Sequence, residues 1–534
     1  MRFSDAYRGA MTTPSDGAAA APTGQRETFS SRRLFILSAI GSAVGLGNIW
    51  RFPYIAYENG GGAFLIPYLA ALLTAGIPLL FLDYAIGHKF RGSAPLAYRR
   101  LHRAAEPLGW WQVLVCFVIA VYYAVIIAWA VMYTGFSVTN AWGADASGFF
   151  TGQFLQVSDT VGVGFNYVPG VVWPLLAVWV VSVVIMVAGV NKGIARANSI
   201  FFPLLLVMFV ILVVQSLFLP GAVDGLNAFF TPDWAALADP GVWAAAYGHI
   251  FFSLSVAFGI MVTYSSYLKR RTDLTGSGMV VAFSNSGFEI LAGIGVFAAL
   301  GFMAFTAGTS VSEVAVSGIG LAFIAFPTIV SAAPFGSLIG VLFFGSLVFA
   351  GMTSLISILE VIIAAVQDKT GWGRVPATLA VSIPTAVVSL VLFPTATGLY
   401  VLDVSDAFVN VFGILAGALV TVIMIAWVLR RLPMLSRHLN LVSSVKMGRT
   451  WIALVAVLAP IVLGYILVNE VIAKASSPYE GYPLDFLAVF GWGMSGLLLV
   501  LGILMAFIPW GARSKLNDPE YEAHAAALEK EAGR

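Results

Sequence analysis

The stretch GSAVGLGNIWRFPY, at residues 41–54, lies in the first long apolar run of the chain, yet it is poorly suited to a continuous membrane helix. Its three glycines lower helix propensity, and Pro53 lacks the backbone N–H that a helix interior needs. Backbone at membrane depth can leave the helix only where protein or a cavity satisfies its polar groups. We therefore expect a break over residues 44–47 that frees carbonyl and amide groups for ligands.

Close packing between helices would also explain small residues in this stretch. Asn48 and Arg51 are not needed for such packing, and polar groups inside a membrane are costly and mark function. A second weak stretch, YGHIFFSLSVAFGIMVTYSSY, places two serines and a glycine in the sixth apolar run, at residues 253–259. Interrupted first and sixth spans predict two five-span repeats of inverted topology, with a binding site where they meet.

The composition of the whole chain predicts an all-α membrane protein. Of its 534 residues, 59% are hydrophobic and 10% are charged, and the mean hydropathy is +0.91. Many apolar runs are long enough to cross a bilayer. Twelve spans are expected, at 34–56, 63–86, 111–136, 171–190, 199–219, 242–267, 278–305, 337–367, 376–394, 400–429, 451–472 and 485–509. The predicted units are an N-terminal tail at 1–33, repeats at 34–220 and 242–430, two further helices at 450–510, and a C-terminal tail at 511–534.

Basic residues divide sharply between the two sets of loops. Of the 28 lysines and arginines, all except Arg51 and Lys474 fall in the tails or in one set of loops. The positive-inside rule then places both termini in the cytoplasm, with the protein in the inner (plasma) membrane. The opposite loops, at 137–170, 220–241 and 306–336, are longer. The last contains GLAFIAFPTIV, which predicts a re-entrant helical hairpin over the extracellular mouth.

The extended opening motif, GSAVGLGNIWRFPYIAYENGGGAFLIPY, resembles the first-span signature of the neurotransmitter:sodium symporters, whose fold is of the LeuT type. The resemblance continues through AVYYAVIIAW, IFFSLSVAFG, FSNSGFE, FAGMTS and LDVSDAF and spans roughly residues 26–430. The outer loops carry no cysteine pair, as expected of a prokaryotic member. This resemblance implies a LeuT-type 5+5 repeat with unwound helices 1 and 6, which transports a solute together with sodium.

Two sodium sites are implied by the resemblance. The matching ligands of the first site are the Ala43 carbonyl, the Asn48 side chain, the carbonyl and hydroxyl of Ser253 and the Asn285 amide oxygen, completed by the substrate carboxylate. Those of the second site are the carbonyls of Gly41, Val44 and Ala350 and the hydroxyls of Thr353 and Ser354. The last three residues share one helix face, at i, i+3 and i+4. Serine and threonine hydroxyls on a helix can instead bond back to their own carbonyls.

The resemblance also implies a substrate site. Amide groups near Gly45, Leu46 and Gly47 would bind the substrate carboxylate at a helix end, and the Tyr123 hydroxyl would donate to it. The rest of the pocket is mostly apolar, which favours a neutral substrate, and is formed by Ser42, Ala43, Ile119, Phe252, Ser253, Ser255, Phe258, Ser354 and Ile358. Relatives that carry amines have an aspartate where this chain has Gly45, so the substrate is expected to bring its own carboxylate. Tyr123 could otherwise be a packing aromatic.

Two charged pairs match the gates of the family. Arg51 and Asp406 match the external gate, and Arg26 and Asp368 match the cytoplasmic one. Solvated loop charges are the simpler reading of Arg26 and Asp368 taken singly. Arg51 differs, because a lone arginine inside a span needs a partner.

Glu289 follows Asn285 by four residues and stands where chloride-dependent relatives have a serine. Its fixed negative charge would replace chloride, so chloride-independent transport is predicted, and protonation of Glu289 on the return step would give proton antiport. A buried glutamate in an unrelated hydrogen-bond network is the alternative.

The expected function is therefore sodium-driven symport of a neutral, hydrophobic amino acid by alternating access. The expected partners are this small-molecule substrate, two sodium ions and membrane lipid, without nucleic acid or chloride. Another zwitterion, such as a short ω-amino acid, taurine or a betaine, is the alternative within transport. A non-transporting sensor or a channel-like protein on the same scaffold is a different class. An enzyme is not expected, because no nucleophile–base constellation is evident. Transport should need no ATP, because no G-x-x-x-x-G-K-[ST] phosphate loop is present.

Overall fold

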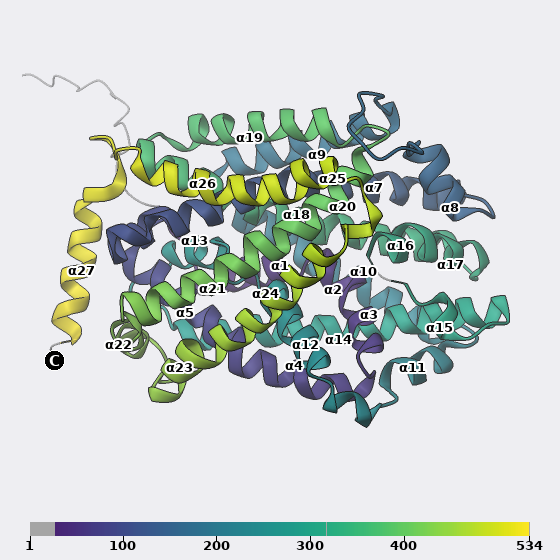
Figure 1. Ribbon diagram of the computed structural model, residues 1–534, viewed down its shortest axis with the longest axis horizontal. Coiled ribbons are helices and arrows are strands. Elements are labelled where there is room, and N and C mark those ends of the chain that lie inside the picture. Colours follow the sequence, from purple (N-terminus) through teal and green to yellow (C-terminus); the bar gives the residue numbers. More distant parts are fainter. Residues whose placement is uncertain (1–26, 317, 533–534) are drawn as a thin grey trace, which may run out of the picture.

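The structure is a computed structural model that describes residues 27–316 and 318–532 (Figure 1). This part of the chain is helical, and its only β-structure consists of the isolated bridges Gly61–Pro232 and Tyr167–Thr395. The helices of the first half are α1 (Arg32–Ala43), α2 (Leu46–Trp50), α3 (Phe52–Glu58), α4 (Leu65–Ala71), α5 (Ile77–Phe90), α6 (Ala94–Leu101), α7 (Glu106–Thr139), α8 (Ala146–Gly148), α9 (Pro169–Val187), α10 (Arg196–Leu217) and α11 (Ala222–Phe230).

The helices of the second half repeat this mixture of long and short elements. They are α12 (Pro240–Ser253), α13 (Ile260–Ser266), α14 (Leu274–Ala307), α15 (Val311–Val314), α16 (Gly318–Gly320), α17 (Phe326–Ala332), α18 (Gly336–Thr370), α19 (Arg374–Leu392), α20 (Gly398–Phe408), α21 (Ala416–Ile423), α22 (Leu432–Val442), α23 (Arg449–Ala453), α24 (Ala459–Ser476), α25 (Leu484–Leu487), α26 (Met494–Phe507) and α27 (Pro519–Ala532). Wider π-helical turns continue several of them, at Leu72–Gly76, Phe149–Phe154, Val190–Ala195, Leu321–Ala325, Val409–Leu415, Met424–Val428, Leu454–Leu458 and Ala488–Gly493. Single 3₁₀ turns lie at Gly62–Phe64, Arg103–Ala105, Trp234–Ala238, Tyr479–Gly481 and Lys515–Asn517.

Within the described residues, ten helices are long and apolar enough to cross a membrane, and the first broken span makes eleven. That span consists of α1 and the α2–α3 pair, which meet at an angle of 54°. Helices α12 and α13 are each too short to pass the same test. Together they occupy the place of the predicted sixth span. The prediction of an all-α membrane fold with broken first and sixth helices is thus confirmed, whereas the count of twelve stays a prediction.

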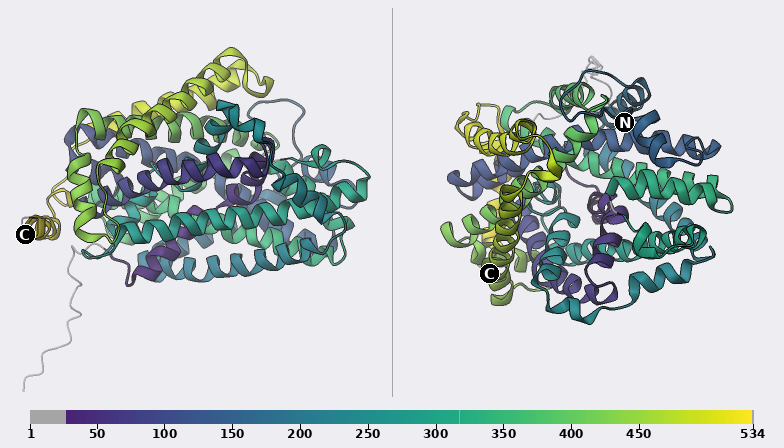
Figure 2. Two further views of the ribbon diagram at one scale, coloured as in Figure 1. Left: turned by 90° about the horizontal axis from the view of Figure 1, so that it is seen from below. Right: turned by 45° about the vertical axis from the view of Figure 1, so that its right-hand side comes forward.

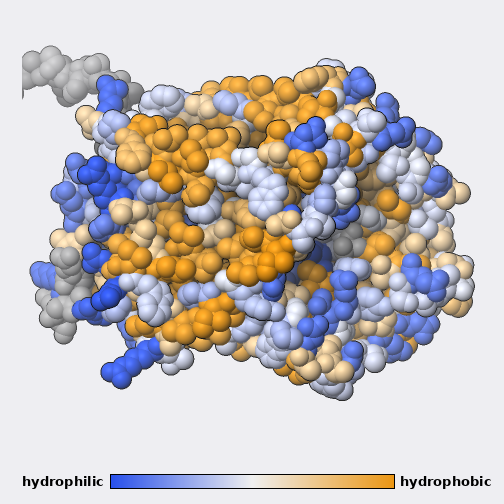
Figure 3. Space-filling view, in the orientation of Figure 1, coloured by the Kyte–Doolittle hydropathy of each residue, from blue (hydrophilic) through white to orange (hydrophobic). Residues whose placement is uncertain are grey.

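The arrangement of the helices separates the two predicted sets of loops. Figure 1 places α22 and α27 at one end of the long axis and α8, α15 and α17 at the other. The long helices run between these ends, as the two further views confirm (Figure 2). Orange, apolar residues cover much of the middle of the surface, while blue, polar residues gather toward both ends (Figure 3). A protein that crosses a bilayer needs this distribution.

Helices α7 and α18 form the centre of the bundle and pack against each other along much of their length. The two halves of the broken first span have largely different neighbours. Helix α1 packs against α10, α14 and α18, whereas α3 packs against α11 and α14. The break therefore lies where both halves of the chain meet, as the predicted repeat requires.

The segment predicted as a re-entrant hairpin differs from that expectation. Residues 318–332 form one short apolar helix made of α16, a π-helical turn and α17, and α15 before them has only four residues. Phe323 in this segment packs against Trp129, Phe150 and Phe344. This aromatic contact anchors the helix at residues 318–332, and the four-residue α15 before it packs Val311 and Val314 partly against the core.

Candidate functional site

The break in the first span is built by residues 44–48. Helix α1 ends where the Val44 N–H donates to the Ile40 carbonyl at 2.7 Å. Gly45 is extended, and its N–H donates to Asn48 Oδ1 at 2.9 Å, which caps α2. The last carbonyls of α1 are therefore free of the helical ladder. The Ser42 carbonyl accepts from the hydroxyls of Ser255 and Ser354, each at 3.4 Å.

The break in the sixth span lies between α12 and α13, at residues 254–259. Ser255, Ala257 and Gly259 have positive φ values of 53°, 62° and 90°. Serine and alanine rarely adopt this left-handed backbone. The Ala257 N–H is held by the buried Asp83 of α5 through a 2.9 Å bond to Oδ2. Asp83 was missed by the sequence analysis, although a carboxylate inside an apolar run is itself a signal of such a partner.

Both breaks open into one cavity of about 560 Å³. All the residues predicted to bind the substrate line it: Ser42, Ala43, Gly45, Leu46, Gly47, Ile119, Tyr123, Phe252, Ser253, Ser255, Phe258, Ser354 and Ile358. The Tyr123 hydroxyl accepts from the Leu46 N–H at 3.4 Å, beside the break. A Cβ built on Gly45 would lie 3.1 Å from the Ser354 hydroxyl oxygen and 3.3 Å from that of Tyr123. The structure therefore brings the whole predicted set together around Gly45.

The cavity also has a wall that the sequence analysis did not anticipate. No chemistry was assigned to the last two spans, yet Glu470 and Lys474 of α24 line the cavity, and Lys474 Nζ lies 3.1 Å from Glu470 Oε2. Asp403, which accepts from the hydroxyls of Tyr479 and Tyr482, also lines it. Lys474 is the one basic residue in the opposite set of loops, and this feature of the sequence could have identified it as a candidate site residue.

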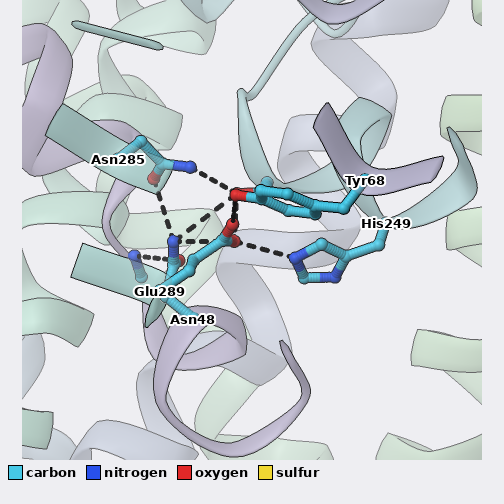
Figure 4. Close-up of polar contacts among 7 residues, drawn as sticks. Asn48, Tyr68, His249, Asn285 and Glu289 are labelled. Carbon is cyan, nitrogen blue, oxygen red and sulfur yellow. Dashed lines mark hydrogen bonds and ion pairs between the residues drawn. The ribbon is translucent and has the colours of Figure 1, made fainter. Parts of the chain in front are cut away.

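A network of polar side chains lies beside the break and contains most of the predicted first sodium site (Figure 4). Asn48 Nδ2 donates to Asn285 Oδ1 at 2.9 Å and to Glu289 Oε1 at 3.1 Å. Ser253 Oγ accepts from Asn285 Nδ2 at 2.6 Å and donates to Glu289 Oε1 at 2.5 Å. Ala43, the remaining predicted ligand, lines the same cavity as Asn48 and Ser253.

Glu289 is fully buried at the centre of this network. Besides Asn48 and Ser253, it contacts His249 Nε2 at 2.8 Å from Oε1, and the Tyr68 hydroxyl donates to Oε2 (Figure 4). Neither His249 nor Tyr68 was predicted. The two oxygens of this carboxylate therefore accept hydrogen bonds from side chains of several other helices.

The residues predicted for the second sodium site lie between α1 and α18. The point where a Cβ would stand on Gly41 is 3.4 Å from Thr353 Cβ. Val44 ends α1, and Ala350, Thr353 and Ser354 are buried on α18. The Thr353 hydroxyl donates its hydrogen to the Phe349 and Ala350 carbonyls of its own helix, at 3.1 and 2.9 Å, as the alternative interpretation of this residue expects. The lone pairs of this hydroxyl oxygen can still coordinate a cation.

The predicted gates are placed as follows. Arg51 and Asp406 both line the cavity, and no ion pair joins these two described residues. The Arg51 guanidinium lies 5.2 Å from the centre of the Phe252 ring, and Asp406 Oδ1 accepts from the Tyr122 hydroxyl at 2.7 Å. In the cytoplasmic pair, Asp368 Oδ2 accepts from the Ser93 N–H at 2.7 Å, and Arg26 lies outside the described residues.

Neutral oxygens dominate the predicted metal-binding region. In residues 27–316 and 318–532 there is no group of three or more His, Cys, Asp or Glu side chains that could hold a metal ion. Carbonyl, hydroxyl and amide oxygens suit a monovalent hard cation better than a transition metal. The donor set around the break therefore fits sodium.

Comparison with known proteins agrees with this geometry. The family model described as the sodium:neurotransmitter symporter family matches residues 26–145 and 143–512. An uncharacterised sodium-dependent transporter of Methanocaldococcus jannaschii is 41% identical over 485 residues, which cover 90% of this chain and 97% of the relative. The sodium- and chloride-dependent GABA transporter 2 of Bos taurus is 32% identical over 72% of this chain and 69% of its own.

A solved structure gives the same result for the fold. The crystal structure of MhsT in complex with L-phenylalanine matches with a TM-score of 0.70 and 31% identity, over 84% of this chain and all of that one. The predicted LeuT-type fold is thus confirmed. The family and the relatives are transporters, so the prediction that the chain is no enzyme is also confirmed. The chain belongs to the sodium:neurotransmitter symporter family.

Proposed function

We propose that the protein takes up a neutral, hydrophobic amino acid together with sodium by alternating access. The single observation that carries this proposal is the cavity at the two helix breaks. There, the free space beside Gly45 belongs to the same cavity that Asn48 and Ser253 line. A zwitterion in this space would place its carboxylate next to a cation bound by those oxygens. Such contact couples the two solutes directly.

The surroundings of Gly45 support a substrate with a carboxylate. The space that an aspartate side chain would fill at this position is bounded by the Tyr123 and Ser354 hydroxyls. The side-chain end of the cavity is apolar and formed by Ile119, Phe252, Phe258 and Ile358, among others. Burial of apolar surface there favours a hydrophobic side chain. The similar MhsT structure holds L-phenylalanine.

Two sodium sites are proposed, at the ligands named above for each. The first shares its polar network with Glu289, whose fixed charge would replace chloride. We further propose proton antiport through protonation of this carboxylate when the solutes have left. The alternative substrate, a short ω-amino acid or a related zwitterion, is supported by the 32% identity to the GABA transporter.

The sidedness of the protein is proposed from its charges. The tails and the loops with nearly all basic residues would face the cytoplasm, and the cavity rim with Arg51 and Lys474 would face outward. The described residues Arg51 and Asp406 form no ion pair although both line the cavity, which supports an outward-facing state before closure. Membrane lipid would surround the apolar band of Figure 3.

Uptake into sealed proteoliposomes tests this function. An inward sodium gradient should drive accumulation of labelled hydrophobic amino acids above the outside concentration, and choline in place of sodium should abolish it. Competition with a panel of amino acids, taurine, betaine and ω-amino acids ranks the substrates. Binding without accumulation would identify a sensor, and simple equilibration would identify a channel-like protein. Equal uptake in choline would refute sodium coupling.

A further inference from the structure

Asn198 on α10 is a buried polar residue with an unexplained oxygen. Its side chain is fully buried, and its Nδ2 donates to the Ile194 carbonyl at 2.9 Å. This bond fixes the amide orientation, because a carbonyl can accept only from the nitrogen. The opposite atom, Oδ1, has no hydrogen-bond partner among the described residues. Buried oxygens without a partner cost free energy, so such an atom calls for a ligand or a functional reason.

The free oxygen points at Gly41, one of the residues predicted for the second sodium site. A Cβ built on Gly41 would lie 2.5 Å from Asn198 Oδ1 but 3.5 Å from Asn198 Cγ, so the oxygen is the leading atom toward α1. The same point is 3.4 Å from Thr353 Cβ. Helix α10 packs against both α1 and α18, the two helices that supply the proposed ligands.

Neighbouring hydroxyls do not satisfy this oxygen. The Thr353 hydroxyl donates to the Phe349 and Ala350 carbonyls, and the Ser357 hydroxyl donates to the Thr353 carbonyl at 2.8 Å. An amide oxygen is a hard neutral ligand of the same kind as the carbonyls already assigned to the site. A bound cation is therefore the partner whose chemistry fits an oxygen in this place.

We propose that Asn198 Oδ1 is a further ligand, direct or through one water, of the sodium ion held between α1 and α18. This assignment deepens the proposed function and rests on it. The ion would then join three helices rather than two. Sodium release would free α10 as well as α1, and would thereby loosen the wall that these helices form.

Sodium binding to the purified full-length protein tests the assignment. Asn198→Leu keeps the size of the side chain but removes the oxygen, and should raise the sodium concentration for half-maximal ²²Na⁺ binding about tenfold. Asn198→Asp keeps an oxygen and adds charge, and should lower that concentration. Ser216→Ala is the matched control, because Ser216 is buried on the same helix and its hydroxyl donates only to the Leu212 carbonyl. It should leave binding unchanged.

Thr353→Val separates this inference from the proposed site. If Thr353→Val weakens ²²Na⁺ binding while Asn198→Leu binds sodium as the unaltered protein does, Asn198 is not a ligand and the proposed site stands. If both variants bind normally, the site itself is misplaced. The sodium-induced rise in thermal midpoint gives a second readout. Should Asn198→Leu aggregate, Asn198→Ser, whose hydroxyl is too short to reach α1, decides in its place by the same criteria.

Discussion

Tyr122 donates a hydrogen bond of 2.7 Å to Asp406, the residue expected to pair with Arg51 when the outer side closes. The bond holds the carboxylate on the α7 side of the cavity, away from the guanidinium, which lies over Phe252. Closure therefore requires the Arg51–Asp406 ion pair to form against the hydrogen bond between Tyr122 and Asp406. The bond is thus a determinant of how readily the cavity shuts over its ligand.

Tyr122→Phe should favour the closed state. A hydrogen bond to a charged group contributes about 1.5–3 kcal/mol, so its loss should lower the half-saturating substrate concentration in sodium buffer about tenfold. Equilibrium binding of the labelled substrate measures the effect. Tyr133→Phe on the same helix is the control, because the Tyr133 hydroxyl has no hydrogen-bond partner among the described residues. An unchanged or weaker affinity in Tyr122→Phe would contradict this view.

Gly45→Asp should change the class of substrate. The new carboxylate would enter the space bounded by Tyr123 and Ser354 and would repel an amino-acid carboxylate. We expect amino-acid binding to fall by at least about a hundredfold, whereas the matching decarboxylated amine should bind better than it does to the unaltered protein. Competition binding with each pair of compounds checks this. Gly45→Ala adds bulk without charge and should weaken both classes alike.

Sodium-driven uptake by the unaltered protein should not depend on chloride, whereas uptake by Glu289→Ser should require it. The substitution removes a fully buried charge from among the donors of Asn48, His249 and Tyr68, and a chloride ion can replace it there. Sodium-driven uptake compared in chloride and gluconate salts is the measurement. Glu313→Ser, at an exposed glutamate of α15, is the matched control. Uptake by the unaltered protein that collapses in gluconate would exclude the assignment of Glu289.

The buried ion pair between Glu360 of α18 and Arg374 of α19 should matter for stability. Arg374 Nη2 lies 2.7 Å from Glu360 Oε2, and their side chains are 11% and 0% exposed. Glu360→Gln should destabilise the protein by about 3–5 kcal/mol, since it leaves a buried arginine without its counterion. Arg32→Ala, in a 3.6 Å pair with Asp273 whose side chains are 46% and 25% exposed, should cost under about 1 kcal/mol. Chemical unfolding in detergent compares the two, and equal losses would refute the distinction.

A glycine at position 371 should be needed for the segment after α26, at residues 511–517, to keep its position. Its φ of +73° favours glycine, and a Cβ there would overlap the Arg513 carbonyl. Gly371→Ala should therefore displace residues 511–517 and speed tryptic cleavage after Arg513 and Lys515. Gly373→Ala, where a Cβ would meet only Pro376 at 4.0 Å, should not. Cleavage rates that match in the two variants would show that the contact is dispensable.

The sequence predicted the parts of the fold that depend on strong local signals. Glycines next to Asn48 located the first break to within a residue or two of Val44–Gly45. Resemblance located the cavity residues, since their spacing along four distant spans has no local signal. The stretch GLAFIAFPTIV, predicted as a hairpin, lies within one helix at residues 318–332 that follows the short α15, because apolar content alone does not tell one helix from two.

Contacts made by single polar residues in otherwise apolar runs were harder to foresee. Asp83 stands out as a carboxylate in an apolar run and His249 and Tyr68 do not, but only tertiary packing brings Asp83 to the Ala257 backbone and the other two to Glu289. Asn198 belongs to the same group. Its oxygen faces Gly41, which has no side chain whose size or charge could indicate the contact in the sequence.

The 54° bend between α1 and α2–α3 gives the first span two mechanical halves. Both halves pack against α14 and α18, while α10 packs against α1 and α11 packs against α3. Away from the break the two halves therefore have separate neighbours, so the angle between α1 and α2–α3 can change while α14 and α18 stay in contact with both. A covalent cross-link between residues 43 and 46 would fix the angle between the two halves. The first span could then move only as one rigid helix pair, and transport that needs the two halves to move separately would stop.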